Sequence, residues 1–196
     1  MSAASPERAL LERALLKIKQ LQGELGKAQQ APRDPIAILG FGLRLPGGVE
    51  DLDSLHRLLD RGGDAISGLV PARFSAQQMA SAPPGARRAG ILEDVRHFDP
   101  GFFGISPREA IRMDPQQRLL LEVSWEALER AGIAPDSLSG SRTGVFLGLS
   151  TDDFRMLNEP TGDEGDAWHT LGVLRCVAAG RVSYTLGLQG PCLALD

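Results

Sequence analysis

The amino-acid sequence predicts an α/β domain with a parallel sheet, preceded by a helix that stands apart from it. Runs of strand length that are largely apolar occur at residues 36–39, 143–149 and 190–196, which is typical of strands that are buried on both faces. A strongly signalled helix lies between the first two runs, and a helix followed by a strand favours parallel pairing. Hydrophobic residues make up 42% of the 196 residues, which is enough for a substantial core.

The overall charge and the cysteine content exclude several classes of protein. The net charge is −4 and no block of Lys or Arg stands alone, so we expect no nucleic-acid or membrane partner. No apolar run approaches the roughly 20 residues of a spanning helix, and the N-terminus lacks a signal-peptide core, so a cytoplasmic location is expected. Two cysteines are too few for a disulfide framework, and neither forms a metal-binding pattern with His56, His97 or His169.

The first predicted element is a helix over residues 5–30, with apolar residues that alternate at spacings of three and four. These residues form the seam of a coiled coil and are Leu11, Ala14, Ile18, Leu21, Leu25 and Ala28. About three heptads with Gly23 and Gly26 on the outer positions are stable only in a dimer or against a partner. The alternative is an ordinary amphipathic helix packed on its own domain. Pro32 and Pro35 indicate an extended linker, so we divide the chain into domains 1–34 and 35–196.

The apolar run 36–39 is expected to be a buried strand that leads into the turn Gly40-Phe41-Gly42. A Gly-x-Gly after a strand suggests a dinucleotide-binding fold, but the third glycine of that fingerprint would fall at Leu45. A phosphate cradle is therefore disfavoured. The following segment, 51–60, predicts a short helix whose four leucines, Leu52, Leu55, Leu58 and Leu59, point inward. His56 among them is expected to be packed or on the surface rather than catalytic.

Residues 62–112 predict a long irregular excursion with short helical turns at 74–79 and 107–112. Long excursions within compact domains are usually functional, partner-binding or structural covers. Three aromatic residues are expected to pin this one to the core, namely Phe98, Phe102 and Phe103. The acidic residues Glu93, Asp94 and Asp99 have no defined pairing, and we interpret them as part of a solvated loop.

The best-specified element is a helix over residues 113–132. Asp114 is a good N-cap, Pro115 suits the first helical position, and Gln117 is expected to reach back to the backbone N–H of the cap. Gly132 is suited to the left-handed conformation that ends a helix. Arg118 with Glu122, and Glu126 with Arg130, are spaced as i,i+4 pairs. Two adjoining apolar faces predict that the helix is covered from two sides; they carry Leu120, Val123 and Ala127, and Leu121, Trp125 and Leu128.

Three further predictions concern the C-terminal third. The run 143–149 predicts a second buried strand, with Gly144 and Gly148 where a neighbour approaches closely. Residues 152–166 carry six acidic residues without calcium-loop spacing, so a mobile surface loop is favoured over a cation site. Residues 168–186 predict one helix that presents Leu174, Ala178, Val182 and Leu186 on one line, with Ala178-Ala179-Gly180 permitting close packing on the sheet or on a second subunit. A third buried strand begins at 190, and since no crossover helix follows it, we expect the chain to be truncated in mid-domain.

Taken together, these stretches resemble the N-terminal part of the ketosynthase (beta-ketoacyl synthase) domain of bacterial modular polyketide synthases, which belongs to the thiolase-like superfamily. The resemblance covers residues 35–196 and is carried by PIAILGFGLRLPGG, FDPGFFGISPREAIRMDPQQRLLLEVSWEALERAGI, SRTGVFLGLS and AAGRVSYTLGLQGPCLALD. It implies an incomplete thiolase-like fold. Residues 5–30 resemble the coiled-coil helix that precedes such domains, where it dimerises and docks on the C-terminus of an upstream synthase subunit.

The resemblance implies a decarboxylative Claisen condensation between an acyl chain and a malonyl-type extender. The acyl carrier protein presents the substrates on its phosphopantetheine arm, no cofactor is bound directly, and the enzyme is expected to be a homodimer. The family nucleophile is the cysteine of an Asp-Thr-Ala-Cys run, and Asp196 matches the first letter of that run. The cysteine and both catalytic histidines fall beyond Asp196. We therefore assign no catalytic, cofactor-binding or metal residue, and we expect this chain alone to be inactive.

Other candidate residues receive no catalytic role. Cys192 is expected to be a small buried side chain within a strand, and Cys176 the same on a helix. No nucleophile is spaced in the sequence to act with His169. Gly172-Val173 departs from the family's usual Gly-Asn, which puts the subunit or channel contact at that point in doubt. The alternatives to an enzyme segment are a docking or dimerisation module and a non-functional gene fragment. Whichever applies, we expect residues 35–196 alone to fold marginally, with exposed apolar sheet.

Overall fold

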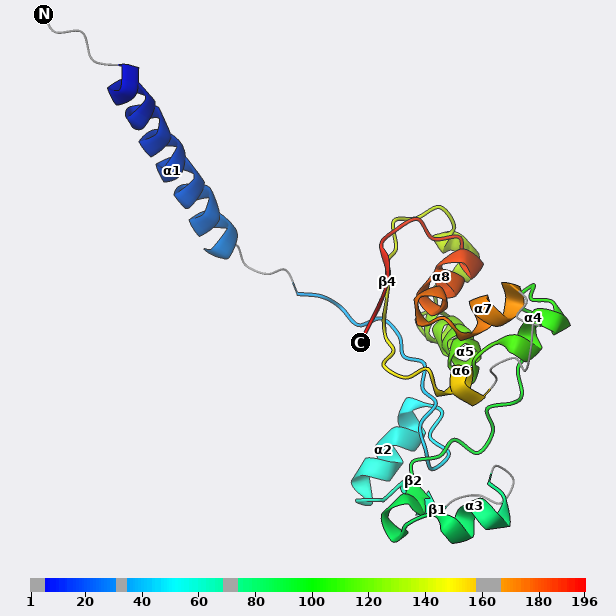
Figure 1. Cartoon of the computed structure of the whole chain (residues 1–196). Helices are drawn as coiled ribbons and strands as arrows, with labels where there is room; N and C mark the ends of the chain where they lie inside the picture. The colour runs from blue at the N-terminus through cyan, green and yellow to red at the C-terminus, as the bar shows by residue number, and fades with distance from the viewer. Residues whose placement is uncertain (1–5, 31–34, 69–73, 158–166) are drawn as a thin grey trace, which may run out of the picture. The chain divides into compact units, whose positions relative to one another are not determined.

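The computed structural model describes residues 6–30, 35–68, 74–157 and 167–196. The chain divides into two compact units, Met1–Ile38 and Leu39–Asp196 (Figure 1).

The first unit contains the helix α1, Pro6–Gln30, which confirms the predicted helix. The large apolar side chains described on it are all at least 51% exposed, including Ile18, Leu21 and Leu25 of the predicted seam. Pairing of this seam with a second helix stays a prediction.

The predicted strand at 36–39 is wrong. The segment has no ladder partner among the described residues, and the Ile36 side chain is 94% exposed. An apolar run forms a strand only where another strand satisfies its backbone groups, and none does so within the described part of the chain.

The second unit contains the parallel sheet that the sequence predicts. The strands β3, Val145–Gly148, and β4, Cys192–Leu195, pair in parallel, with Val145 opposite Cys192 and Gly148 opposite Leu195. The helix α8, Arg175–Thr185, contacts both strands and also packs on α5, Pro115–Arg130. The sheet, α8 and α5 therefore pack against one another (Figure 1).

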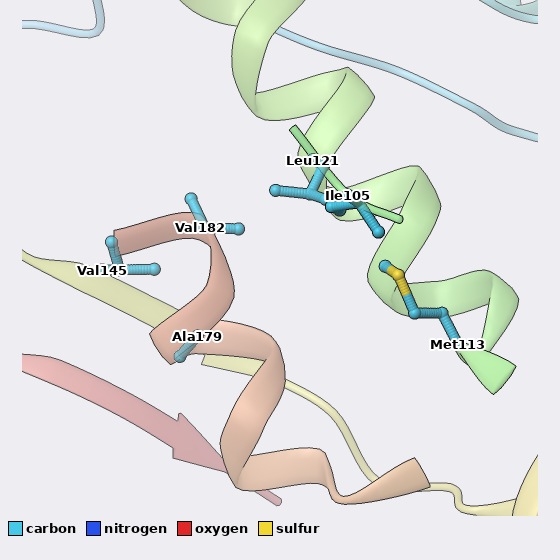
Figure 2. Packing of buried hydrophobic residues seen from close by; sticks show 6 residues of the cluster. All are labelled: Ile105, Met113, Leu121, Val145, Ala179 and Val182. Atoms are coloured by element: carbon cyan, nitrogen blue, oxygen red, sulfur yellow. The ribbon is translucent and has the colours of Figure 1, made fainter. Parts of the chain in front are cut away.

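The hydrophobic core lies where α5, α8 and β3 meet. Figure 2 shows its six buried side chains, which are Ile105, Met113, Leu121, Val145, Ala179 and Val182. Met113 and Ala179 are completely buried. On α5 itself only Gln117 and Leu121 are buried, and the other apolar residues of the helix are half-buried. The prediction that α5 is covered from two sides therefore holds only partially.

The ends of α5 confirm some of the predicted signals and correct others. The Asp114 side chain caps the helix, but it accepts from the Gln116 N–H at 2.8 Å, and the Gln117 side chain points elsewhere. The predicted return of Gln117 to the cap is wrong. Gly132 adopts a left-handed φ of 68°, and the Ile133 N–H donates to the Leu128 carbonyl at 2.9 Å, as expected for this kind of helix end.

Of the two predicted i,i+4 pairs on α5, only one forms as expected. Arg130 lies 3.6 Å from the Glu126 carboxylate. Arg118 instead donates to the Met113 carbonyl, through Nε at 3.1 Å and Nη2 at 2.7 Å. Because that carbonyl lies before the first helical turn, the side chain turns away from Glu122.

The predicted single helix over 168–186 is two helices in the structure. The helix α7, Ala167–Val173, ends before Leu174, whose backbone is extended, and α8 begins at Arg175. The Gln117 amide donates to the carbonyls of Leu171, Gly172 and Leu174 at 2.9–3.3 Å, and the Asp114 N–H donates to the Gly172 carbonyl at 2.9 Å. The break is stable because α5 satisfies the carbonyl groups that it exposes.

The helix α2, Leu52–Asp60, is capped by Asp51 and carries no buried residue. Leu55 and Leu58 are half-buried, whereas Leu52 and Leu59 are exposed, so the prediction of four inward leucines is wrong for two of them. His56 is on the surface, 3.2 Å from the Asp60 carboxylate, which is one of the two positions predicted for it, packed or at the surface.

The excursion over 62–112 contains only short elements in its described part, as expected. These are β1, Ser67–Gly68; α3, Ala76–Ser81; η1, Pro84–Ala86; β2, Arg88–Ala89, which pairs with β1; and α4, Pro107–Arg112. The predicted aromatic anchors are confirmed: Phe98 stacks on Phe103, and both Phe102 and Phe103 contact Trp125 of α5 edge to face.

The two remaining elements are η2, Pro135–Leu138, and α6, Asp153–Leu157. The helix α6 occupies part of the stretch that was predicted to be an acidic loop, so the prediction is wrong for residues 153–157. Residues 158–166 of that loop lie outside the described residues.

Candidate functional site

The carboxyl ends of β3 and β4 lie next to each other and form the candidate site. Asp196 follows β4, and its carboxylate accepts from the Arg175 guanidinium at 2.9 Å. The same Nη1 atom of Arg175 lies 3.0 Å from the Ser150 carbonyl, just after β3. Because Arg175 is the first residue of α8, this one side chain connects the helix to both strand ends.

A cavity of about 430 Å³ adjoins these strand ends. Its lining comprises Leu149, Leu174, Arg175, Cys176, Ala194, Leu195 and Asp196. In open α/β sheets, ligands bind outside the carboxyl ends of parallel strands, so the position is suited to a functional site. The described lining supplies one guanidinium, one carboxylate and one thiol, but no imidazole that could act as a base beside the thiol.

The structure corrects the predicted burial of the two cysteines. Cys176 and Cys192 are both exposed free thiols. Cys192 begins β4 and so lies at the strand end opposite Asp196. Cys176 lines the cavity as the second residue of α8. The sequence could not reveal this exposure, because an apolar run looks the same whether or not a neighbour covers it.

The histidines and the acidic residues considered in the sequence lie apart from this cavity. His169 is buried within α7. The Asp94 carboxylate pairs with His97 on the surface at 2.7 Å, and the Arg96 backbone N–H lowers the pKa of Asp94. Asp99 accepts from the Phe102 N–H at 3.1 Å, and Glu93 is exposed. The acidic side chains with described partners therefore stabilise turns.

A polar network behind the site was missed at the level of sequence. Arg181 of α8 forms an ion pair with Glu109 of α4, and its Nε donates to Oε1 of Gln117 at 2.9 Å. The two paired side chains are only 10% and 14% exposed. Together with the contacts of Gln117 to α7, this network joins α4, α5, α7 and α8. The one sequence feature that could have indicated this network is Arg181 itself, a charged residue directly after the small residues 178–180.

The glycines after the expected first strand serve close packing. A Cβ atom at Gly40 would lie 2.2 Å from the Ala127 carbonyl oxygen, and one at Gly42 would lie 2.0 Å from that of Val123. Since carbonyl oxygens of α5 face both glycines, the segment cannot cradle a phosphate here. Phosphate binding by the turn Gly40-Phe41-Gly42, which the sequence already disfavoured, is therefore excluded.

Polar contacts fix the same segment on α5. Arg44 forms a two-pronged pair with Glu126, which raises the pKa of Arg44. Arg130 donates to the carbonyls of Phe41 and Glu50 at 3.1 and 3.0 Å.

The predicted close approaches in and around β3 are partially confirmed. A Cβ atom at Gly144 would lie 3.1 Å from the Pro191 carbonyl oxygen, whereas the space around Gly148 is open. Gly172, in the dipeptide that departs from the family pattern, also packs closely, since a Cβ atom there would lie 2.1 Å from the Arg112 carbonyl oxygen.

The described residues contain no cluster of three or more His, Cys, Asp or Glu side chains that could hold a metal ion. In the same part of the chain, no helix has both the length and the apolar character needed to cross a membrane.

Residues 33–196 match the family model described as "Beta-ketoacyl synthase, N-terminal domain". The chain is 46% identical over 177 residues to the spectinabilin polyketide synthase system protein NorA' of Streptomyces orinoci, covering 86% of this chain and 5% of that protein. It is 43% identical over 189 residues to erythronolide synthase EryA3 of Saccharopolyspora erythraea, covering 96% and 6%. The chain thus spans less than a tenth of the length of these relatives.

Solved structures give the same result. The ketosynthase from module 6 of the bacillaene synthase of Bacillus subtilis 168 matches with a TM-score of 0.69 and 31% identity, over 82% of this chain and 26% of that one. The oxazolomycin ketosynthase domain OzmH KS7 of Streptomyces albus JA3453 matches with a TM-score of 0.69 and 35% identity, over 81% and 28%. The described fold is thus the N-terminal part of a thiolase-like ketosynthase fold, and the chain belongs to the beta-ketoacyl synthase family through its N-terminal domain.

Proposed function

We propose that this chain forms the N-terminal scaffold of a polyketide-synthase ketosynthase and does not carry the catalytic groups. The observation that carries the proposal is the Arg175 contact with Asp196, which fixes the carboxyl end of β4 next to β3. In the family pattern, Asp196 opens the run that holds the nucleophilic cysteine. Arg175 would therefore help to hold the point from which the catalytic turn departs.

In the complete domain, the proposed reaction is a decarboxylative Claisen condensation. A cysteine thiolate takes the acyl chain from the phosphopantetheine thiol of an acyl carrier protein as a thioester. Loss of CO₂ from a malonyl-type extender leaves a carbanion, which attacks the thioester carbonyl and releases the cysteine thiolate. Backbone N–H groups stabilise the oxyanion. The proposed setting is a cytoplasmic homodimer, and the chain described here supplies the sheet and the helices behind the reacting groups.

The proposal predicts that the isolated chain does not self-acylate. Incubation with an acyl N-acetylcysteamine thioester, followed by intact-mass measurement, is expected to leave Cys176 and Cys192 unmodified, because the described lining around Cys176 holds no imidazole and Cys192 lies at the strand end opposite Asp196. A stoichiometric thioester that Cys176→Ser abolishes and Cys192→Ser retains would contradict the proposal. Reading the codons that follow Asp196 tests the same idea at the genetic level, since Thr-Ala-Cys in frame is expected.

A second candidate function is that of a docking module, supported by the exposed apolar seam of α1. Ile18, Leu21 and Leu25 are each more than half exposed. Because they follow one another at spacings of three and four residues, they lie on the same face of the helix. We propose that the seam pairs with a second copy of α1 and then binds the C-terminal end of an upstream synthase subunit. Leu16 lies about 200° around the helix from Ile18, because each residue advances about 100°.

Sedimentation of the full chain over a concentration series tests this pairing. Ile18→Asp is expected to shift the chain toward monomer, since it places a charge in the seam. Leu16→Asp serves as the matched control, because Leu16 is also exposed but lies on the opposite side, and it is expected to leave the association unchanged. A chain that is monomeric at all concentrations, or equal losses in both variants, would contradict a role for this seam.

A further inference from the structure

The Arg118 guanidinium near the start of α5 is half-buried and forms no described ion pair with a carboxylate. Its described hydrogen bonds go to the Met113 carbonyl, through Nε at 3.1 Å and Nη2 at 2.7 Å. The carboxylate whose charge acts on it belongs to Asp114, but that group accepts from the backbone and side chain of Gln116 at 2.8 and 3.2 Å. Burial lowers the pKa of Arg118, so its charge is incompletely solvated.

The contact with Met113 leaves part of the guanidinium available. An arginine has five N–H donors in a planar fork, and the carbonyl occupies two of them. The Nη1 side remains for an acceptor, and a planar carboxylate or phosphate matches the end of the fork with two parallel hydrogen bonds.

Arg118 and Arg96 line the same cavity of about 210 Å³. The other lining residues are apolar, namely Phe98, Pro100, Pro107, Ala110 and Ile111. Arg96 is 74% exposed, and its Nε lies 3.9 Å from Asp94, whose carboxylate also binds His97 at 2.7 Å. The one acidic residue of α4, Glu109, forms an ion pair with Arg181. The cavity therefore combines two cations with an apolar wall.

We propose that this cavity is a binding site for a small organic oxyanion, held by the guanidinium groups of Arg118 and Arg96, with its apolar part against Phe98 and Ile111. Ile111 is 74% exposed on a helix that otherwise packs on α7, which leaves an apolar surface for the ligand to cover. The volume is below that of a site for a drug-sized molecule, so it fits a short carboxylate or phosphate monoester. This site is separate from the strand-end cavity and does not depend on the proposed condensation.

Chemical-shift titration of the isotope-labelled full chain tests the site, with butyrate and methyl phosphate as the two anionic probes and butanol as the uncharged control. Saturable shifts of the Ile111 methyl group and the Arg118 Nε–H are expected with at least one anion. A dissociation constant of about 1–10 mM is in reach of a ligand with so few atoms. Comparison of the dissociation constants of butyrate and methyl phosphate shows whether the site prefers a carboxylate or a phosphate.

Three variants decide whether the two arginines form the site. Arg118→Lys keeps the charge but loses the fork, and it is expected to weaken binding about tenfold. Arg96→Gln, at an exposed position where folding is not at risk, is expected to weaken binding about threefold to tenfold. Arg142→Gln, an exposed arginine outside the cavity lining, is the matched control and is expected to have no effect.

The proposal fails if neither anion produces saturable shifts, or if butanol binds as well as butyrate. It also fails if Arg96→Gln binds as tightly as the unchanged chain. Since Arg96→Gln does not depend on the structural bond of Arg118 to Met113, this result stands even if Arg118→Lys disturbs the start of α5.

Discussion

The helices α1 and α5 have the same kind of start signal, but they differ in how much of their apolar surface is buried. Both have proline at the first helical position and leucines at helical spacing. On α1 every large apolar side chain that is described is 51–72% exposed, whereas Leu121 on α5 is only 2% exposed. Local signals are therefore sufficient to start a helix, but only contacts from elsewhere in the chain place it within a core.

The polar contacts of the two helices differ in the same way. On α1, Gln20 bonds to Glu24 at 2.8 Å and Lys17 to Gln20 at 3.3 Å, so these contacts are local. On α5, Glu126 pairs with Arg44, and Gln117 accepts from Arg181 and donates to α7. The contacts of α5 therefore connect it to residues that are distant in the chain.

Glu109→Gln is expected to destabilise the second unit by about 3 kcal/mol. The substitution leaves the Arg181 guanidinium buried with only Gln117 as a described side-chain acceptor, and removing one partner of a buried pair is costly. Urea unfolding followed by circular dichroism measures the loss. Asp64→Asn is the matched control, because its pair with Arg88 is 62% exposed on both sides and is expected to contribute less than about 0.5 kcal/mol. Equal effects in the two variants would show that burial of the Glu109–Arg181 pair is unimportant.

The same glycine-to-alanine change is expected to have opposite effects in the two units. Gly172→Ala should destabilise the fold by about 2 kcal/mol, because its Cβ would meet the Arg112 carbonyl oxygen at 2.1 Å and the backbone must shift. Gly23→Ala should stabilise α1 by about 0.5–1 kcal/mol, because nothing lies within 4 Å and alanine is the better helix former. Thermal unfolding of the full chain measures the first change, and helix content by circular dichroism measures the second.

Gly180→Ala is the control within the second unit. Its Cβ would also have open space, although the residue lies on α8 beside the buried Ala179. A small stabilisation is expected, as at Gly23. A loss at Gly180 as large as that at Gly172 would mean that close packing is not the cause of the effect.

Glu122→Gln is expected to produce the smallest change, a stabilisation of about 0.3 kcal/mol near pH 7. Burial against α5's neighbours raises the pKa of Glu122, so the folded state favours the protonated form. A raised carboxyl pKa contributes stability below the unfolded pKa, and this contribution is lost as the pH rises through the folded pKa. The glutamine variant should therefore be more stable near neutral pH and equal to the unchanged chain near pH 3. Thermal melts at both pH values measure this, and a stabilisation that grows as the pH falls would contradict the sign.

The sequence predicted elements whose signals are local. Asp114 and Gly132 mark the ends of α5 because a cap and a left-handed glycine act within one turn. The aromatic residues at 98–103 predicted an anchor, and two of them, Phe102 and Phe103, contact Trp125. A parallel sheet was also predicted, and β3 and β4 form one.

The failures share a different cause. The run at 36–39 has strand composition but lacks a neighbouring strand among the described residues, and the expected single helix over 168–186 is interrupted where Gln117 supplies hydrogen bonds from α5. The two cysteines were expected to be buried because of their apolar neighbours in sequence, yet both are exposed. Each error concerns a partner that is distant in the chain.

For this protein, the sequence by itself determined the ends of α5, the presence of a parallel sheet and the resemblance to ketosynthases, because caps, apolar runs and ordered motifs are properties of short segments. Only the tertiary structure decided which helix is buried, where α7 stops, and that Arg175 fixes the end of β4 at Asp196. These features depend on hydrogen bonds and ion pairs between residues that are 21 to 89 positions apart. Such contacts form only when the chain has folded, and the order of residues alone does not reveal them.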